Sequence, residues 1–236
     1  MAPEVHGELE HAWCVTREQS ADIQRRLAQH VELRSLPANG PGSPLVAAGV
    51  DVAYAKDGSL AWAVAAAMDR SFTVVSMSVA EGRPDSAYAP GFLAFREGRL
   101  TIEALTGLDV RPDLVFLDGH GVVHKRGLGI ASHVGVLLGI PTIGVPKTPF
   151  HAVDRTPGPD RGDYYTLTKE WGAQGASIRL KAGVKPVYVS PGHLVDLPSA
   201  LALSLAWSTG SHRVPEPLAA AHTMSVRARN AAAGTL

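Results

Sequence analysis

Apolar residues that recur with a period near 3.6 mark the helices along this chain. In the first helix Ile23, Leu27 and Val31 recur every four residues, and Thr16 with Gln19 has the spacing of a capping box. Similar stripes, bounded by Gly, Pro or Asp, follow later in the chain. The pattern predicts helices over residues 16–33, 92–105, 130–138, 196–207 and 217–229.

Short apolar runs between turn residues predict the strands, over residues 45–53, 60–68, 72–79, 114–117, 142–145, 177–181 and 187–189. The first three follow one another closely, as antiparallel hairpins do, and the next two alternate with helices, as βαβ units do. We therefore expect an α/β fold with one mixed sheet and helices on both faces, in a single domain over 1–236. Residues 1–12 are candidates for disorder, and 148–163 is expected to be a surface loop rich in Pro, Gly and Asp.

Composition narrows the classes of function. The chain has 236 residues, 45% of them hydrophobic and 19% charged, which is typical of a globular domain. Lys plus Arg and Asp plus Glu both total 22, so the net charge is zero. Proteins that coat nucleic acid through bulk charge are basic, so any nucleic-acid binding here requires a local patch, a metal or a shaped pocket.

The same sequence bears on location. Cys14 is the single cysteine, so no disulfide can form within the chain, which favours a reducing compartment. The acidic first residues lack the apolar segment of a secretory signal, and no apolar run is long enough to cross a bilayer. We expect a cytoplasmic protein that has no membrane partner and works as a monomer.

Carboxylates in apolar surroundings are the strongest candidates for chemistry. Asp51 interrupts a run rich in β-branched residues, where it lies either on a solvated strand face or in a site. Asp118 follows the buried run 114–117 at its carboxyl end, where α/β sheets bind ligands, whereas Asp113 precedes that run and is interpreted as a solvated charge. Glu97 lies on a predicted helix, a position usually exposed to solvent. Oxygen ligands of this kind suit Mg²⁺ or Mn²⁺.

A zinc site is the competing interpretation for the histidines. His120, His124 and His133 lie close in sequence, but the glycines around the first two prevent helical i, i+4 spacing, and no cysteine is nearby. Structural zinc usually takes four nitrogen or sulfur ligands, so we disfavour zinc and interpret His133 as a core residue.

Several sequence blocks, in order, resemble the endonuclease V family along almost the whole chain. They are AGVD at 48–51, YAPGFLAFREG at 88–98, DLVFLDGHG at 113–121, LGIASH at 128–133, PTIGV at 141–145, VSPGH at 189–193 and PEP at 215–217. The resemblance implies a ribonuclease H-like fold. It also implies a DNA repair enzyme that recognises deoxyinosine and hydrolyses a phosphodiester on its 3′ side, leaving 3′-hydroxyl and 5′-phosphate ends.

By this resemblance, five residues are catalytic. Asp51, Glu97 and Asp118 look like the acids that hold Mg²⁺, for which Mn²⁺ can substitute, with Asp51 and Asp118 in direct contact and Glu97 acting through water. Lys147 looks like the lysine near the scissile phosphate, where it would stabilise transition-state charge. His222 looks like the active-site histidine.

The resemblance also implies residues that bind the base. The segment 88–90 looks like a wedge in which Tyr88 stacks and Pro90 stiffens the turn, although Ala87 and Ala89 replace bulkier family residues. An extruded hypoxanthine would then enter a pocket. The expected substrate-binding residues are Tyr88, Pro90, Gly91, Leu93, Gly119, Gly121 and His124.

The sequence leaves open how residues 124–126 contribute to binding and which nucleic acid the protein binds. The cluster His124-Lys125-Arg126 either contacts phosphate or is a solvated turn, and zero net charge favours phosphate contact slightly. The expected partner is deoxyinosine-containing DNA, with inosine-containing RNA as an alternative. A protein that binds deaminated bases without cutting is the rival from another class, although it would lack one of the acids.

Overall fold

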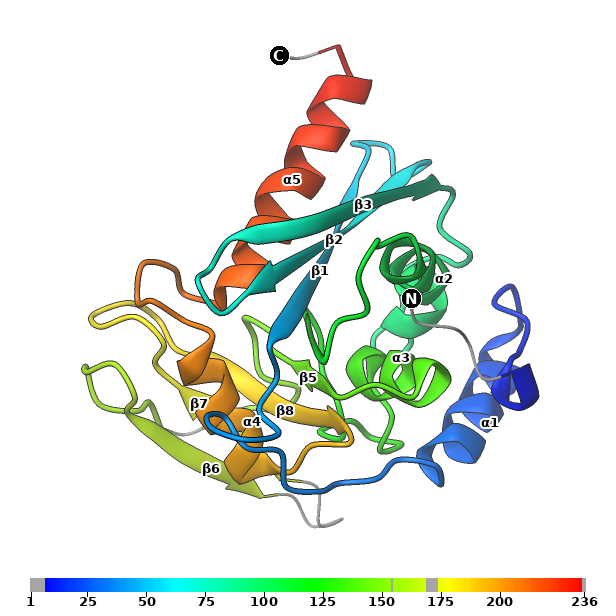
Figure 1. Ribbon diagram of the computed structural model, residues 1–236. Helices are drawn as coiled ribbons and strands as arrows, with labels where there is room; N and C mark the ends of the chain where they lie inside the picture. The colour runs from blue at the N-terminus through cyan, green and yellow to red at the C-terminus, as the bar shows by residue number, and fades with distance from the viewer. Residues whose placement is uncertain (1–6, 154, 169–173, 235–236) are drawn as a thin grey trace.

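The fold is built on one large sheet with helices on both sides (Figure 1). A computed structural model describes residues 7–153, 155–168 and 174–234. The helices are η1 (Gly7–Leu9), α1 (Arg17–Ala28), α2 (Leu93–Thr106), α3 (Ile130–Leu138), α4 (Leu197–Ala206) and α5 (Glu216–Ala232). The strands are β1 (Val46–Tyr54), β2 (Ala61–Asp69), β3 (Val74–Gly82), β4 (Leu114–Leu117), β5 (Thr142–Gly144), β6 (Tyr164–Thr168), β7 (Gln174–Ile178) and β8 (Val187–His193).

The sheet has the order β3-β2-β1-β4-β5-β8-β7-β6. Strands β1, β4 and β5 are parallel, and every other neighbouring pair is antiparallel. The early hairpins and the later βαβ connections were both predicted from the sequence, so the expected mixed sheet is confirmed. The parallel strands are central, which leaves the carboxyl end of β4 beside the longer strand β1.

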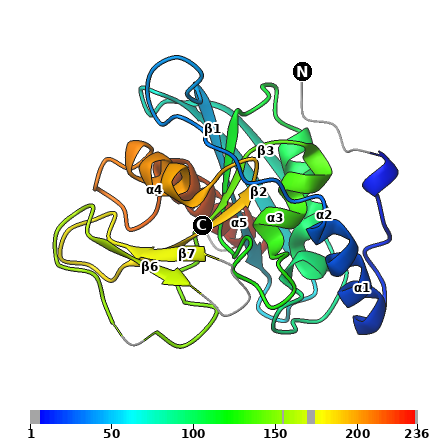
Figure 2. The ribbon, with the colours of Figure 1, turned by 90° about the horizontal axis from the view of Figure 1, so that it is seen from below.

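Alternating side chains build a core on each face of the sheet. In β4, Val115 and Leu117 belong to the cluster that packs against α2 and α3, whereas Leu114 and Phe116 belong to the cluster that packs against α4 and α5. This period of two is the strand geometry expected when both faces are covered. Figure 2 shows α1, α2 and α3 on one side of the sheet and α4 on the other.

A close approach at Gly49 seats α5 on β1. A Cβ atom at this position would lie 2.2 Å from the Pro217 carbonyl carbon and 2.3 Å from the Leu218 nitrogen. Glycine therefore lets the helix backbone contact the strand directly. This contact fixes the first turn of α5 and thereby the height of its later residues above β1.

The first helix is shorter than predicted, because it ends at Ala28 rather than at residue 33. The segment beyond it forms backbone bonds with the chain that follows β8: Leu194 N–H donates to Glu32 O at 2.7 Å, and Asp196 N–H donates to Arg34 O at 2.8 Å. These tertiary bonds replace further helical turns. The predicted capping box of Thr16 and Gln19 is confirmed.

Three further segments differ from the sequence-based expectation: strand β6, strand β7 and the amino-terminal segment 1–12. Strand β6 was not predicted, and β7 covers 174–178 where 177–181 was expected. The described residues of 148–163 contain no helix or strand, as predicted. Residues 1–6 of the segment expected to be disordered lie outside the described residues, but Leu9 and Trp13 pack against the core and His11 contacts His133.

No helix in the described part of the chain is long and apolar enough to cross a membrane.

Candidate active site

Asp51 and Asp118 come together at the carboxyl end of β4. Val50 is the register partner of Leu117 in the parallel pair of β1 and β4, so the residues that follow them are neighbours. Both acids line a small cavity of about 90 Å³, and Glu97 reaches the same cavity from α2. The three acids that the sequence analysis selected from distant stretches therefore surround one space.

Helix α5 holds Asp51 in place. The side chain of Asp51 is 8% exposed, and its Oδ2 contacts His222 Nδ1 at 3.1 Å and accepts a hydrogen bond from Ser225 Oγ at 2.5 Å. Neither contact uses Oδ1, so that oxygen stays available to a ligand. Ser225 was not predicted; its spacing of three residues from His222 on one helix was the available signal.

Glu97 is the acid with the most perturbed ionisation. Its Oε1 accepts a hydrogen bond from the Tyr54 hydroxyl at 2.6 Å, and the Arg96 guanidinium lies 4.4 Å from the centre of the Tyr54 ring. Burial raises the pKa of Glu97 to about 7; the Tyr54 bond opposes this shift, and the charges of Asp118 and Asp51 add to it. A carboxyl with this pKa can bind or release a proton near neutral pH.

Asp118 pairs with the predicted lysine. Lys147 Nζ lies 2.5 Å from Asp118 Oδ2. The polar side chains that line the small cavity are the three carboxylates and Thr101, all of them oxygen donors, which fits a hard divalent cation. In the chain as described, no three His, Cys, Asp or Glu side chains are gathered closely enough to hold one ion, because each acid is turned towards a neighbouring side chain.

A larger cavity of about 530 Å³ opens beside the acids. Leu93, Asp118 and Ile130 line both cavities, so the two spaces are adjacent. Six of the seven predicted substrate-binding residues line the larger one: Tyr88, Pro90, Gly91, Leu93, Gly119 and His124. Lining residues that the sequence analysis missed include Gln24, His120 and Phe150.

Gly121, the seventh predicted residue, lies outside the larger cavity. A Cβ atom there would lie 1.9 Å from Pro191 O, so the glycine allows the turn after β4 to pack against β8. Gly119 combines both roles, since it lines the cavity while a Cβ would meet Ile130 Cγ2 at 2.4 Å. Gly121 thus has a packing role outside the larger cavity, and its contact with a base stays a prediction.

Two of the three residues in the cluster at 124–126 contact the Gly91 carbonyl, and phosphate contact by the cluster stays a prediction. The Gly91 carbonyl accepts from Arg126 Nη2 at 2.6 Å and from Gln24 Nε2 at 3.1 Å, and His124 Nε2 lies 3.0 Å from it. Burial lowers the pKa of His124 to about 4, and the Arg126 charge adds to this, so the imidazole is neutral. Lys125 is the exposed member of the cluster.

Buried neutral histidines predict a loss of stability in acid. The pKa of His124 is about 4 in the folded protein and 6.5 without the fold, so the unfolded chain binds the extra proton first as pH falls. The contribution of His124 to the free energy of unfolding is fully present above pH 6.5 and is lost as pH falls from 6.5 to about 4, by on the order of 3 kcal/mol. Urea unfolding at pH 7, 6 and 5 measures the decline.

The variant His124→Gln should flatten that decline, because glutamine does not titrate. His30 is exposed, so His30→Gln is the matched control and should leave the wild-type pH dependence unchanged. An equal decline in wild type and His124→Gln would contradict the assignment of a buried neutral imidazole at this position.

Comparisons with known proteins agree with the geometry. The sequence profile described as endonuclease V matches residues 25–223. An endonuclease V of Kosmotoga olearia is 39% identical over 220 residues, which cover 93% of this chain and 95% of that protein.

Solved structures show the same fold. The crystal structure of endonuclease V from Streptomyces avermitilis has a TM-score of 0.84 at 36% identity, covering 99% of this chain and all of that chain. The Bacillus subtilis endonuclease V structure has a TM-score of 0.88 at 29% identity, covering 98% and 99%. These similarities confirm the expected ribonuclease H-like fold, and with the matching profile they show that this chain belongs to the endonuclease V family.

Proposed function

We propose that this protein is a Mg²⁺-dependent endonuclease that recognises deoxyinosine in DNA and hydrolyses a phosphodiester on its 3′ side, leaving 3′-hydroxyl and 5′-phosphate ends. The observation that carries the proposal is the adjacency of a cavity large enough for a nucleotide base and a cluster of three acids, joined through Leu93, Asp118 and Ile130. Recognition of the base and attack on the backbone would then occur next to each other. Family membership supports the same activity.

The acids would hold the cation. Asp51, Glu97 and Asp118 are the proposed ligands, with Mn²⁺ as a substitute for Mg²⁺. When bound, such a cation supplies Lewis-acid polarisation of the phosphate and eases deprotonation of water. Lys147 would exchange its contact with Asp118 for one with the phosphate, and His222 would orient groups around Asp51.

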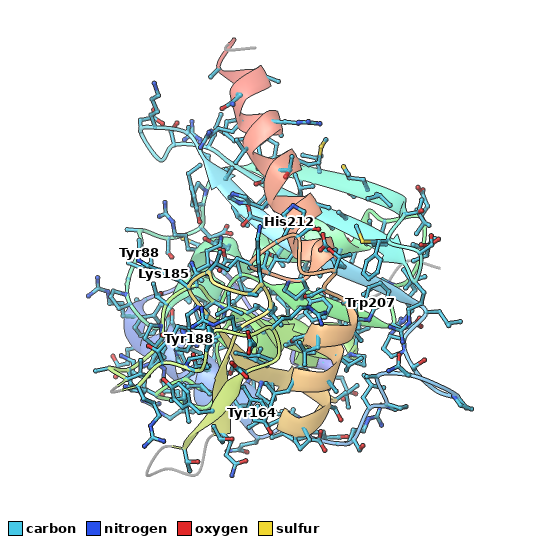
Figure 3. All side chains as sticks on the ribbon, turned by 90° about the vertical axis from the view of Figure 1, so that its left-hand side faces the viewer. Tyr88, Tyr164, Lys185, Tyr188, Trp207 and His212 are labelled. Carbon is cyan, nitrogen blue, oxygen red and sulfur yellow. The ribbon has the colours of Figure 1, made fainter. Side chains whose placement is uncertain are left out.

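The wedge would act through Tyr88 and Pro90. Tyr88 is 65% exposed and lies at the rim of the larger cavity, where a ring can stack in the space that the extruded base leaves (Figure 3). The backbone N–H of Gly91 is a candidate for contact with hypoxanthine, whereas the Gly119 N–H already donates to Leu117 O at 2.9 Å. The Gly91 carbonyl is already bonded to side chains from α1 and from the segment after β4.

Replacing Tyr88 by alanine should weaken discrimination between inosine and normal strands by about tenfold, because one base–aromatic stacking contact contributes roughly 1–3 kcal/mol. Competition binding with matched strands measures the ratio. Tyr164, 56% exposed on β6, provides the control, since Tyr164→Ala removes a comparable ring away from the cavity. Unchanged selectivity in Tyr88→Ala would remove the wedge from the proposal.

A cleavage assay tests the function as a whole. Duplex DNA, single-stranded DNA, RNA and hybrid strands, each with one inosine, are incubated with Mg²⁺ or with chelator. Metal-dependent nicks 3′ to deoxyinosine are expected. Cleavage confined to the RNA strands would favour the inosine-specific ribonuclease, and binding without products in Mg²⁺ would favour a protein that marks deaminated bases.

A further inference from the structure

A group of unpaired cations lies beside Lys147, outside both cavities. Lys181 and Lys185 are in the connection between β7 and β8, and Arg213 is in the loop that precedes α5. We call these three residues the basic patch. In the part of the chain that the structure describes, none of them forms an ion pair with an acid.

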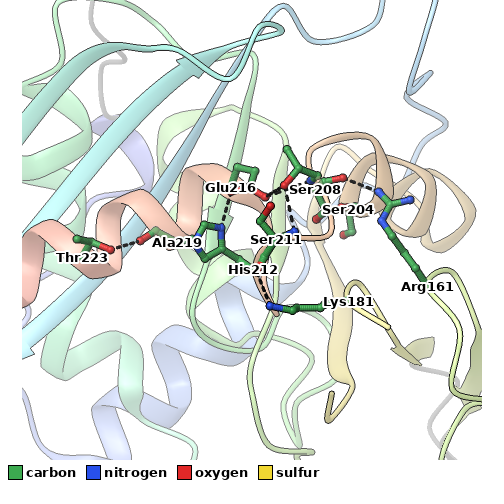
Figure 4. A network of polar contacts seen from close by, with 10 residues as sticks. Arg161, Lys181, Ser204, Ser208, Ser211, His212, Glu216, Ala219 and Thr223 are labelled. Carbon is green, nitrogen blue, oxygen red and sulfur yellow. Dashed lines mark hydrogen bonds and ion pairs between the residues drawn. The ribbon is translucent and has the colours of Figure 1, made fainter. Parts of the chain in front are cut away.

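Backbone carbonyls hold the basic patch without neutralising it. Lys181 Nζ donates to Ser211 O at 2.8 Å, and Arg213 donates from Nε to Lys185 O at 2.9 Å and from Nη2 to Pro186 O at 2.6 Å (Figure 4 shows the Lys181 contact). A carbonyl carries no net charge, so each cation keeps its full positive charge. Arg213 uses Nε and Nη2 in these bonds, which leaves the two N–H groups of Nη1 for a partner.

The basic patch is continuous with the candidate active site. Arg213 Nη2 also donates to Lys147 O at 3.0 Å, and Lys147 Nζ contacts Asp118. One guanidinium therefore connects the segment that carries the proposed phosphate-binding lysine with the loop that carries Lys185. The Arg213 guanidinium is thus held in place relative to Lys147 before any partner arrives.

Acids near the basic patch are engaged elsewhere. Glu216 is 8% exposed, and its carboxylate contacts Thr209 and His212. Asp163 Oδ2 accepts a hydrogen bond from the Asp160 backbone N–H at 2.8 Å. In a chain with no net charge, this group of cations is a local positive field.

We propose that the basic patch binds the sugar–phosphate backbone of the strand being cut, on the 3′ side of the scissile phosphate. Its cations are spread over two loops, which fits a line of phosphates better than one small anion. None of the three cations lines either cavity, and Arg213 contacts the backbone of Lys147, which lines the larger cavity, so a strand whose base enters that cavity would pass Lys147 and continue over the patch. The 3′ direction rests on the proposed function, whereas backbone binding does not.

Lys185→Ala tests the proposal with little risk to the fold, because the contact within the protein uses the Lys185 carbonyl and not its side chain. Binding of a labelled DNA strand with one inosine is measured in chelator over a range of salt concentrations. Affinity should fall about fivefold, and the slope of log K against log salt should shrink by roughly 0.7–0.9. The double variant Lys181→Ala/Lys185→Ala should shrink it about twice as much.

Matched controls separate the possible outcomes. Arg111 is exposed at the amino end of β4, the end remote from the acids, so Arg111→Ala should leave the salt slope unchanged. The Lys185 effect should persist on strands that extend only 3′ of the inosine and vanish on strands that extend only 5′. An unchanged slope in the double variant, an equal loss in Arg111→Ala, or an effect confined to 5′ extensions would overturn the proposal.

The same assay distinguishes this inference from the proposed function. A DNA strand without inosine should show the same change of slope, since backbone contact does not depend on the base. If wild type fails to cut inosine strands while Lys185→Ala still lowers the slope, the nuclease proposal fails and backbone binding stands. If wild type cuts inosine strands normally while Lys185→Ala leaves the salt slope unchanged, the nuclease proposal stands and backbone binding by the basic patch fails.

Discussion

Replacing Asp118 by asparagine is expected to abolish cleavage while leaving inosine binding largely intact. The substitution keeps the shape of the side chain but removes the negative charge that pairs with Lys147 and that would hold the cation. Loss of one ligand should cost at least about 4 kcal/mol in the barrier, roughly 1,000-fold in rate. Single-turnover cleavage and equilibrium binding on the same DNA strand measure the two effects separately.

Asp113→Asn is the matched control, because Asp113 lies at the opposite end of the same strand. Its Oδ2 accepts from the Leu45 and Val46 backbone N–H groups at 2.9 and 3.0 Å, so it supports the start of β1 instead of being merely solvated. An asparagine oxygen can still accept these bonds, and cleavage should stay within about twofold of wild type. Turnover by Asp118→Asn near the wild-type rate would refute its proposed role.

A methyl group at Gly49 is expected to produce a large loss of stability. Gly49→Ala would place its Cβ 2.2 Å from the Pro217 backbone, so α5 must move away from β1. Overpacking against backbone should cost about 3 kcal/mol, which lowers the melting temperature by roughly 6–12 °C for a chain of this size. Cleavage should fall as well, because His222 and Ser225, the two residues that contact Asp51, both lie on α5.

Gly7→Ala provides the comparison, since nothing lies within 4 Å of a Cβ at that position. Calorimetric melting of both variants at pH 7 should separate them clearly. A Gly49→Ala protein that melts within a degree of wild type would mean that α5 does not rest on the strand at this point.

Sequence patterns predicted the fold best where burial decides the local structure. The run 114–117 is apolar at every position and is a strand buried on both faces. The first helix was predicted too long because its last turns compete with bonds to Leu194 and Asp196, which lie more than 160 residues further along the chain. The pattern within 16–33 contains no trace of these partners, so tertiary contacts determined the boundary.

The candidate site residues also differ in how far the local sequence alone predicts them. Asp118 was selected from its own surroundings, because a carboxylate at the end of a buried strand is unusual. Glu97 needed the family resemblance, since a helical glutamate is ordinarily solvated, and its convergence with Asp51 depends on how α2 packs. The inward orientation of His124 depends on the Gly91 carbonyl, which is 33 residues away and cannot be inferred from local spacing.

The ion pair between Lys147 and Asp118 bears on how the protein can be stored without the proposed cation. Three carboxylates around a space of about 90 Å³ would repel one another if all were charged and unpaired. Here the ammonium compensates one of them, and the elevated pKa of Glu97 lets a second hold a proton near neutrality. Chelator-treated protein should therefore keep its native shape through purification and accept magnesium afterwards.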